Sequence, residues 1–533
     1  MTGGVRLAKG LFCLLVLIAA FHTSPLRSHA AEDEGATLFE IRTFELAGNT
    51  IFPADQLRET VKPFTGSGKT VADVEKARDA VEKLYHNAGY PAVLVNIPEQ
   101  TVNEGIVKLQ IIESRIGRVN ISGNRYFTKE KIMRDLPSFR QGEIVYMPKV
   151  QEEIARLNKN EDFKVDPVMA PGKEPGTVDV ELKVEDRLPL HGYLELNNRA
   201  SPNTEHLRLN ALIRYDNLWQ REHSISFQYQ TSPQDMSQVQ AASGSYVLPA
   251  PWEKDHLLAL YGVWSDSNTA FGQGFDVVGK GWIFGLRYVT PLPAYKLYAH
   301  NITIGLDYKD LKENLGVTTG GPTTKTPVSY LPLSFAYSAS LADKWGLTQL
   351  SGGLNLSFRG VVSDQREFET KRFKAMANYV YVTGGIQRTQ KLPWGMGLFI
   401  KVDGQLADGP LLSSEEYAAG GMQSVRGYKE FSALGDNAMH GIAELSFPDP
   451  FKKIAGKWLQ LSPYLFYDAA RVTVKEPLPG QDRGTTLMGA GVGFRGSLTK
   501  HLEYEFDWAT ALKETEQTKK NEQQFYFKVR AVF

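Results

Sequence analysis

An alternation of apolar and polar residues fills the last two thirds of the chain, from Leu190 to Phe533. Residues 501–508 read His-Leu-Glu-Tyr-Glu-Phe-Asp-Trp, so polar and apolar side chains exchange at every step. Residues 525–533 continue the pattern with Phe-Tyr-Phe-Lys-Val-Arg-Ala-Val-Phe. Because successive side chains of a strand point to opposite faces, this period of two predicts strands with one apolar and one polar face.

The apolar faces of these segments end in aromatic residues, as the girdles of membrane barrels do. A soluble sandwich or a propeller would also alternate and is the competing interpretation. We count about sixteen segments by the ten-residue criterion, and bacterial barrels have an even number of strands. We therefore predict a membrane all-β barrel of about 16 antiparallel strands over residues 189–533. The segments begin at about residues 190, 205, 222, 238, 255, 275, 298, 327, 346, 372, 394, 437, 458, 485, 501 and 524.

The N-terminus has the pattern of a secretory signal peptide. Arg6 and Lys9 precede an apolar run from Leu11 to Phe21, and the small residues Ser28 and Ala30 follow. This run is too short to cross a bilayer, and a buried helix fits the flanking residues less well. We predict a signal peptide over residues 1–30 and a short linker over 31–38. The sole cysteine, Cys13, would be removed, so no disulfide framework is expected in the mature chain.

Charge and motifs argue against nucleic-acid binding and against catalysis. Lys plus Arg and Asp plus Glu both number 60, whereas nucleic-acid carriers are usually basic. We find no HExxH zinc motif and no Gly-x-Ser-x-Gly elbow, so we predict no catalytic residue, no metal and no cofactor. The segment 66–70, Gly-Ser-Gly-Lys-Thr, looks like half a phosphate loop, but Pro63 stands where the motif requires glycine. We expect a loop before a helix there.

Two related segments precede the alternating region. Residues 44–49, Phe-Glu-Leu-Ala-Gly-Asn, recur as 119–124, Val-Asn-Ile-Ser-Gly-Asn, and Phe52 recurs as Phe127 at the same offset. Each copy begins with an alternating strand that ends at Gly-Asn, a turn dipeptide.

Both copies then show helical spacing and close on a second alternating stretch. In the first copy, Thr70 and Asp73 have the spacing of a capping box, and Gly89 follows the helical stretch. The order β-α-α-β-β predicts two small α+β domains, over residues 39–114 and 115–188.

Residues of both copies resemble a known family. The stretch 97–100, Ile-Pro-Glu-Gln, with 109–113, Leu-Gln-Ile-Ile-Glu, is similar to the first polypeptide-transport-associated (POTRA) domain of ShlB/FhaC-type two-partner secretion transporters. Residues 171–178 resemble the end of their second such domain. The resemblance implies two POTRA domains in the periplasm and a barrel in the Gram-negative outer membrane. Family members often begin with a helix that plugs the barrel, which we do not expect in so short an N-terminal segment.

A long connection between the segments near 394 and 437 contains the residues expected to close the pore. This lumenal loop, about 408–436, includes Val425-Arg426-Gly427-Tyr428, which matches the Val-Arg-Gly-Tyr/Phe tip of the family's inward-folded loop. In the strand that begins near 458, parity places Tyr464, Phe466 and Asp468 toward the lumen. The resemblance implies that Asp468 holds Arg426 as a lock. Without the resemblance, a solvated loop charge is the favoured interpretation of Arg426, since surface arginines are common and weakly paired.

The expected activity is export of a protein. A sixteen-stranded barrel leaves an aqueous channel, but a bare helix already needs about 10–12 Å, so a cargo must cross unfolded. The resemblance implies recognition of a large β-helical exoprotein by the POTRA domains, whose binding residues the sequence does not identify. Other expected partners are outer-membrane lipid and the assembly machinery that reads the terminal Phe533. Alternatives are an outer-membrane insertase of the same superfamily and a diffusion porin.

Overall fold

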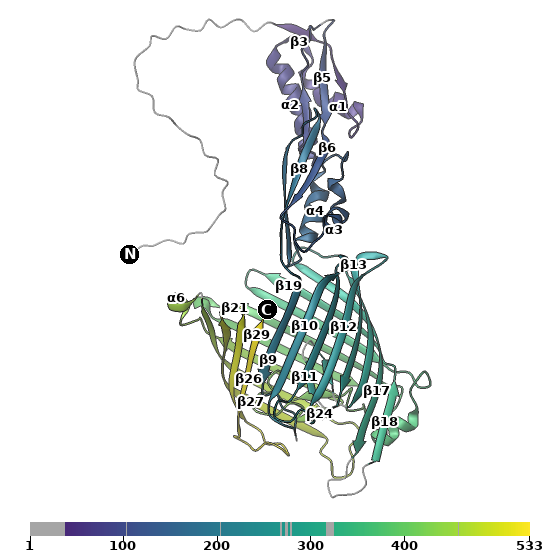
Figure 1. Ribbon diagram of the computed structural model, residues 1–533, viewed down its shortest axis with the longest axis vertical. Coiled ribbons are helices and arrows are strands. Elements are labelled where there is room, and N and C mark those ends of the chain that lie inside the picture. Colours follow the sequence, from purple (N-terminus) through teal and green to yellow (C-terminus); the bar gives the residue numbers. More distant parts are fainter. Residues whose placement is uncertain are drawn as a thin grey trace. The chain divides into compact units, whose positions relative to one another are not determined.

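The computed structural model describes residues 38–102, 104–202, 204–266, 269–271, 275–277, 280–315, 324–456 and 458–533. The predicted signal peptide and all but the last residue of the linker lie outside these ranges. The chain forms two compact units, coloured along the sequence in Figure 1. The first comprises the residues up to Ser122 together with Leu136–Leu157 and Asp166–Lys183. The second comprises Gly123–Asp135, Asn158–Val165 and Val184–Phe533.

The first repeat packs two helices on a three-stranded sheet. Its order is β2-β5-β4, with β2 parallel and β4 antiparallel to β5. The Gly-Ser-Gly-Lys segment, expected as a loop, is instead strand β3 and pairs with β1. The capping box of Thr70 and Asp73 starts α2 as predicted. The elements are β1 Phe39–Ile41, β2 Thr43–Ala47, α1 Ala54–Val61, the 3-10 turn Lys62–Phe64, β3 Gly66–Lys69, α2 Val71–Asn87, β4 Val93–Asn96 and β5 Ile106–Glu113.

The second repeat has the same sheet order. Its strands run β6-β8-β7, with β6 parallel to β8, just as β2 is parallel to β5. The predicted β-α-α-β-β order is therefore confirmed in both repeats, with the β1–β3 pair as an addition in the first. The elements are β6 Arg115–Ser122, α3 Lys129–Asp135, the 3-10 turn Pro137–Phe139, α4 Met147–Leu157, β7 Phe163–Pro171 and β8 Thr177–Asp186.

The shared Gly-Asn dipeptide makes the same turn in both repeats. Gly48 and Gly123 have φ of +94° and +87°, and a Cβ on either would lie 2.2 Å from a carbonyl oxygen of a neighbouring strand. The asparagine that follows each glycine donates its amide at 2.9 Å to the carbonyl of Phe52 or Phe127. Only glycine satisfies both the backbone angle and the close approach, which explains why the dipeptide recurs.

A carboxylate closes the same turn. Glu113, at the end of β5, accepts hydrogen bonds from the backbone N–H groups of Thr50 and Ile51 at 2.8 and 2.9 Å and from the hydroxyl of Tyr85 at 3.0 Å. Burial would raise the pKa of Glu113, but these hydrogen bonds outweigh it and hold the pKa below its usual value. Asp186 accepts from the backbone N–H groups after Asn124 in the same way.

Replacing Glu113 with Gln should destabilise the first repeat by about 1–3 kcal/mol at neutral pH, because buried donors lose their charged acceptor. The lowered pKa means that this stability is present above the unfolded-state pKa and is lost as the pH falls through the folded-state pKa. The difference between wild type and E113Q should therefore shrink as the pH falls below about 4.5. Denaturant-dependent hydrogen exchange of peptides from residues 39–114 measures it, and a difference independent of pH would contradict the prediction.

The second unit contains a closed antiparallel barrel (Figure 1). Seventeen described strand segments form the ring, but β18 and β19 both pair with β17 along successive parts of its length, so they occupy one position. The predicted barrel of sixteen strands is confirmed. The segments are β9 Leu190–Asn197, β10 Arg208–Leu218, β11 His223–Thr231, β12 Gln240–Ala250, β13 Glu253–Ser265, β16 Gly281–Pro291, β17 Tyr298–Leu315, β18 Thr324–Tyr330, β19 Leu333–Asp343, β20 Gly346–Leu356, β21 Val380–Lys391, β22 Gly397–Ala407, β25 Asn437–Ser446, β26 Leu459–Thr473, β27 Gly484–Leu498, β28 Leu502–Ala511 and β29 Gln523–Val532.

Two expected strand starts are wrong. Near residue 275, β15 (Phe275–Val277) pairs only with β14 (Thr269–Phe271), and the barrel strand β16 begins later, at Gly281. Near residue 372, helix α5 (Gln365–Lys371) has just ended, and the barrel strand β21 begins only at Val380. Asp364 caps α5, and Phe368 is buried against β18 residues, so tertiary packing selects a helix there.

The barrel has an apolar outer face and a polar inner face. On β28, Asp507 is 1% exposed while the next residue, Trp508, is 54% exposed. On β26, Tyr464, Phe466 and Asp468 are buried while Leu465 and Tyr467 are exposed. The period of two thus sorts side chains between lumen and surface as the sequence predicts. None of the helices in the described ranges is long and apolar enough to cross a bilayer.

Candidate functional site in the barrel lumen

The site is built on the connection between β22 and β25, residues 408–436. Two short strands, β23 (Tyr417–Ala419) and β24 (Ala433–Gly435), pair with each other within this lumenal loop. Gly420 and Gly421 follow β23 with φ of +106° and +105°, which lets the chain turn sharply. The segment beyond them carries Arg426.

Arg426 contacts Asp468 of β26 with both arms of its guanidinium. Its Nε and Nη2 donate to the two carboxylate oxygens, each at 2.7 Å, and its backbone N–H donates to Oδ2 at 3.1 Å. Arg426 is 3% exposed and Asp468 is 0% exposed. The structure therefore brings together the two residues that the family resemblance pairs, in the bidentate geometry that gives arginine–carboxylate contacts their strength.

Three further groups surround Arg426: Phe466, which parity places toward the lumen, and two carboxylates that sequence reasoning missed. Nη1 donates to Glu444 of β25 at 2.8 Å, and Asp507 of β28 lies 3.7 Å away. The guanidinium carbon lies 3.5 Å from the ring centroid of Phe466, a cation–π contact. Parity could have pointed Glu444 and Asp507 inward, but only strand register places them beside the loop.

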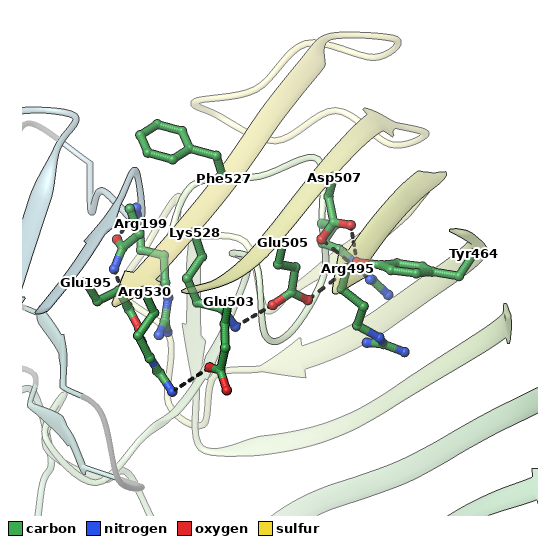
Figure 2. A network of polar contacts seen from close by, with 12 residues as sticks. Glu195, Arg199, Tyr464, Arg495, Glu503, Glu505, Asp507, Phe527, Lys528 and Arg530 are labelled. Atoms are coloured by element: carbon green, nitrogen blue, oxygen red, sulfur yellow. Dashed lines mark hydrogen bonds and ion pairs between the residues drawn. The ribbon is translucent and has the colours of Figure 1, made fainter. Parts of the chain in front are cut away.

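A ladder of charged pairs continues along the inner wall from this site (Figure 2). Arg495 of β27 donates to Glu444 at 2.7 Å, and Lys528 of β29 pairs with Glu505 of β28. At the closing seam, Arg530 of β29 donates to Glu195 of β9 at 2.7 Å. Basic and acidic side chains alternate along this ladder, so each of these charges has a partner of opposite sign, as burial in a low dielectric requires.

The residues next to Arg426 fit the wall closely. Val425 is fully buried, and Gly427 has φ of +103° with its N–H donating to the hydroxyl of Tyr526 at 2.8 Å. A Cβ on Gly427 would lie 3.0 Å from the backbone nitrogen of Ala511. The hydroxyl of Tyr428 lies 2.7 Å from the carbonyl oxygen of Lys513 and 3.0 Å from that of Met488. These contacts attach the tip to β27, β29 and the end of β28.

Glu430 attaches the loop to the start of the barrel. It accepts from Arg199, just after β9, at 2.9 Å, and its N–H donates to the carbonyl of Ala200 at 3.1 Å. Phe533 lies at the opposite end of the seam, where its backbone exchanges two hydrogen bonds with Gly192 at 3.0 and 3.1 Å. A Cβ at Gly192 would lie 2.3 Å from the Phe533 ring, so glycine leaves room for the terminal aromatic residue.

One group of potential metal ligands occurs in the described ranges. Atoms of Asp162, His191 and Asp216 lie within 4.8 Å of one another. Arg187 donates to Asp162 at 2.6 Å and Arg214 to Asp216 at 3.0 Å, so both carboxylates already have charged partners. The arrangement is that of a structural ion-pair cluster.

Comparison with known proteins places the chain in a family. A model described as POTRA domain, ShlB-type, matches residues 39–114. A model described as haemolysin secretion/activation protein ShlB/FhaC/HecB matches residues 176–496, more than half of the chain.

Individual relatives are more distant. The heme/hemopexin transporter protein HuxB of Haemophilus influenzae is 18% identical over 393 residues, which cover 72% of this chain and 67% of HuxB. The outer membrane transporter CdiB of Dickeya dadantii is 23% identical over 386 residues, covering 69% and 65%. The chain thus spans about two thirds of the length of these relatives.

Solved structures share the fold. CdiB from Escherichia coli superposes with a TM-score of 0.62 at 16% identity, covering 95% of this chain and 93% of that one. BamA from Haemophilus ducreyi lacking POTRA domains 1–3 gives 0.55 at 16% identity, covering 93% and 100%.

Barrel, POTRA repeat and inward loop together define an outer-membrane transporter with periplasmic POTRA domains. The chain belongs to the ShlB/FhaC/HecB family of haemolysin secretion/activation proteins, the outer-membrane transporters of two-partner secretion. Members of this family export a partner exoprotein, and they are transporters rather than enzymes. The family match favours the first of the three expected functions over the insertase and the porin.

Proposed function

We propose that this transporter captures an unfolded exoprotein through its POTRA domains, residues 39–114 and 115–188, and passes it through the barrel of residues 189–533 when the lumenal loop undocks. The main support for this proposal is the buried Arg426–Asp468 contact, which attaches the long loop to the inner wall. Residues 1–30 act as the signal peptide and 31–38 as a linker. The cargo is a large β-helical protein, whose folding outside retains it there.

The lock consists of Arg426 and Asp468, with Val425, Gly427 and Tyr428 fitting the tip to the wall. The docked loop closes a pore that would otherwise leak. Phe533 serves as the terminal residue read by the assembly machinery before the barrel enters outer-membrane lipid. Its exposed ring at the end of the seam supports this role.

The first POTRA domain receives the cargo as an added strand at β2. Sheet edges accept extended segments through backbone hydrogen bonds. On the other edge, β4, two outward backbone groups are already bonded to α2: the N–H of Val95 donates to Glu82 at 3.1 Å, and Val93 O lies 3.0 Å from His86 Nε2. Edge β2 has no strand beyond it among the described residues.

A crossed pair of variants tests receptor and gate separately. Deleting residues 39–114 should abolish binding of the partner exoprotein while leaving a heat-modifiable barrel and a closed pore. Arg426→Ala should leave binding intact while opening the pore. Pull-down with the exoprotein's N-terminal region and conductance in planar bilayers give the two readouts. Unchanged binding by the deletion variant would refute the receptor role, and ion flux without any peptide binding would support a porin.

A further inference from the structure

The lumenal loop is attached to the barrel by a second set of buried contacts that does not include Arg426. We define the stem as residues 411–419 and 433–436, and the tip as residues 420–432. In the stem, Glu415 accepts from Lys309 of β17 at 2.5 Å, from the hydroxyl of Tyr330 of β18 at 2.7 Å and from that of Tyr381 of β21 at 2.9 Å. Three barrel segments therefore meet at one carboxylate.

Asp436 makes a similar junction at the other side of the stem. It is fully buried and accepts from Arg372 at 2.7 Å and from the backbone N–H groups of Leu411 and Lys475, each at 2.6 Å. Arg372, which follows α5, also donates to Glu416 at 2.5 Å. One carboxylate thus ties the two ends of the loop to each other and to two outer connections of the barrel.

Apolar packing reinforces the stem. Leu411 and Leu412 are buried in one cluster with Tyr330 of β18 and Phe368 of α5. Hydrogen bonds inside this cluster are shielded from water and therefore strong. Conversely, withdrawing the stem would leave the largely buried Lys309 and Arg372 without their carboxylate partners, which is costly.

The two sets of polar contacts lie on different parts of the wall. The tip contacts β25 to β29 and the segment after β9, whereas the charged groups of the stem contact β17, β18, β21 and the connections next to β21 and β26. No side chain belongs to both polar sets, so the two parts share only apolar packing, in the cluster where Ala419 and Ala433 of the stem lie with Val425 of the tip. Gly420 and Gly421, the first two residues of the tip, both have positive φ where the chain leaves the stem after β23.

We infer that the loop works in two parts: a stem fixed by Glu415 and Asp436, and a tip that alone leaves the wall when Arg426 is released. Glu415 and Asp436 are positioning residues, because they hold the point about which the tip turns. This inference rests on the proposed gate function. A cargo then displaces only residues 420–432, and the fixed stem returns the tip to Asp468 once the cargo has passed.

Hydrogen exchange with mass spectrometry on the full chain in lipid nanodiscs tests the division. In Arg426→Ala, amides of the tip should exchange about tenfold faster or more, while amides of the stem stay within about twofold of wild type. In Glu415→Ala, amides of the stem should accelerate while the tip stays protected by Arg426. Lys374→Ala, which removes an exposed ion pair with Glu476, is the matched control and should change neither.

Exchanging the charges of Lys309 and Glu415 tests whether their ion pair holds the stem, as distinct from the volume of the two side chains. Lys309→Glu combined with Glu415→Lys restores an ion pair, and the hydroxyls of Tyr330 and Tyr381 can accept from the new ammonium group. This double variant should regain most of the stem protection lost in either single variant. The inference is overturned if Arg426→Ala exposes stem and tip equally, if the wild-type stem exchanges as fast as the tip, or if the double variant recovers nothing. Unchanged conductance in Arg426→Ala would instead refute the gate and leave the two-part exchange pattern standing.

Discussion

Replacing Arg426 with alanine is expected to open the pore permanently and to raise its conductance several-fold. The variant leaves Asp468, Glu444 and Asp507 buried together, with Arg495 as their nearest remaining cation. Breaking a buried ion pair by removing one partner costs about 3–5 kcal/mol. Applied to the docked loop, this cost lowers its population relative to the undocked state by roughly two to four orders of magnitude.

The carboxylates should show a graded response. Asp468→Asn should raise the conductance less than Arg426→Ala does, because Glu444 and Asp507 still neutralise the guanidinium. The double variant should lose less docking free energy than the sum of the two single losses, because Asp468→Asn removes one of the charges that Arg426→Ala leaves unpaired. Reversing both charges should restore little, because an aspartate at position 426 would face Glu444 and Asp507.

Conductance in planar bilayers, with export of the exoprotein as a second readout, measures this series. Arg388→Ala is the matched control, because Arg388 also makes a two-armed contact, with Asp343 at 2.7 and 3.0 Å, at a place away from the loop. Wild-type conductance in Arg426→Ala would contradict the gate. An effect of Asp468→Asn as large as that of Arg426→Ala would contradict the role assigned to the other two carboxylates.

The barrel could be predicted because its main signal is local. A period of two needs only neighbouring residues, and it sorted Tyr464, Phe466 and Asp468 from Leu465 and Tyr467 correctly. The same local signal failed near residue 372, where Phe368 buries itself as part of a helix. This packing could not be predicted from the local sequence, because the residues that Phe368 contacts lie on β18, distant in the chain.

Some contacts of the candidate site could be predicted from the sequence and others could not. Arg426 and Asp468 were paired through a resemblance between motifs, which carries information about distant contacts. Glu444, Asp507 and Arg495 come from three other strands, and their meeting depends on strand register, which alternation leaves open. The same holds for the Arg530–Glu195 pair, since closure of the first strand on the last is a global property of the ring.

Gly489→Ala is expected to reproduce the open pore without touching any charge. A Cβ at Gly489 of β27 would lie 1.8 Å from the carbonyl oxygen of Arg426, a distance that van der Waals repulsion forbids. That oxygen belongs to the backbone beside Asp468, so it cannot move aside while the bidentate contact persists. The methyl group should therefore expel the tip while the barrel keeps its strands.

The matched control is Gly384→Ala on β21, where no heavy atom lies within 4 Å of the added Cβ. Both variants should remain heat-modifiable in electrophoresis, which reports a folded barrel. Only Gly489→Ala should raise conductance and accelerate hydrogen exchange in residues 420–432, to the level of Arg426→Ala. The two substitutions act by different means, steric and electrostatic, but both should lead to the same undocked loop. Combining them should therefore add almost nothing to the conductance of either variant alone. A clearly larger effect in the double variant, or a protected tip in Gly489→Ala, would show that the loop does not close the pore in the docked position described.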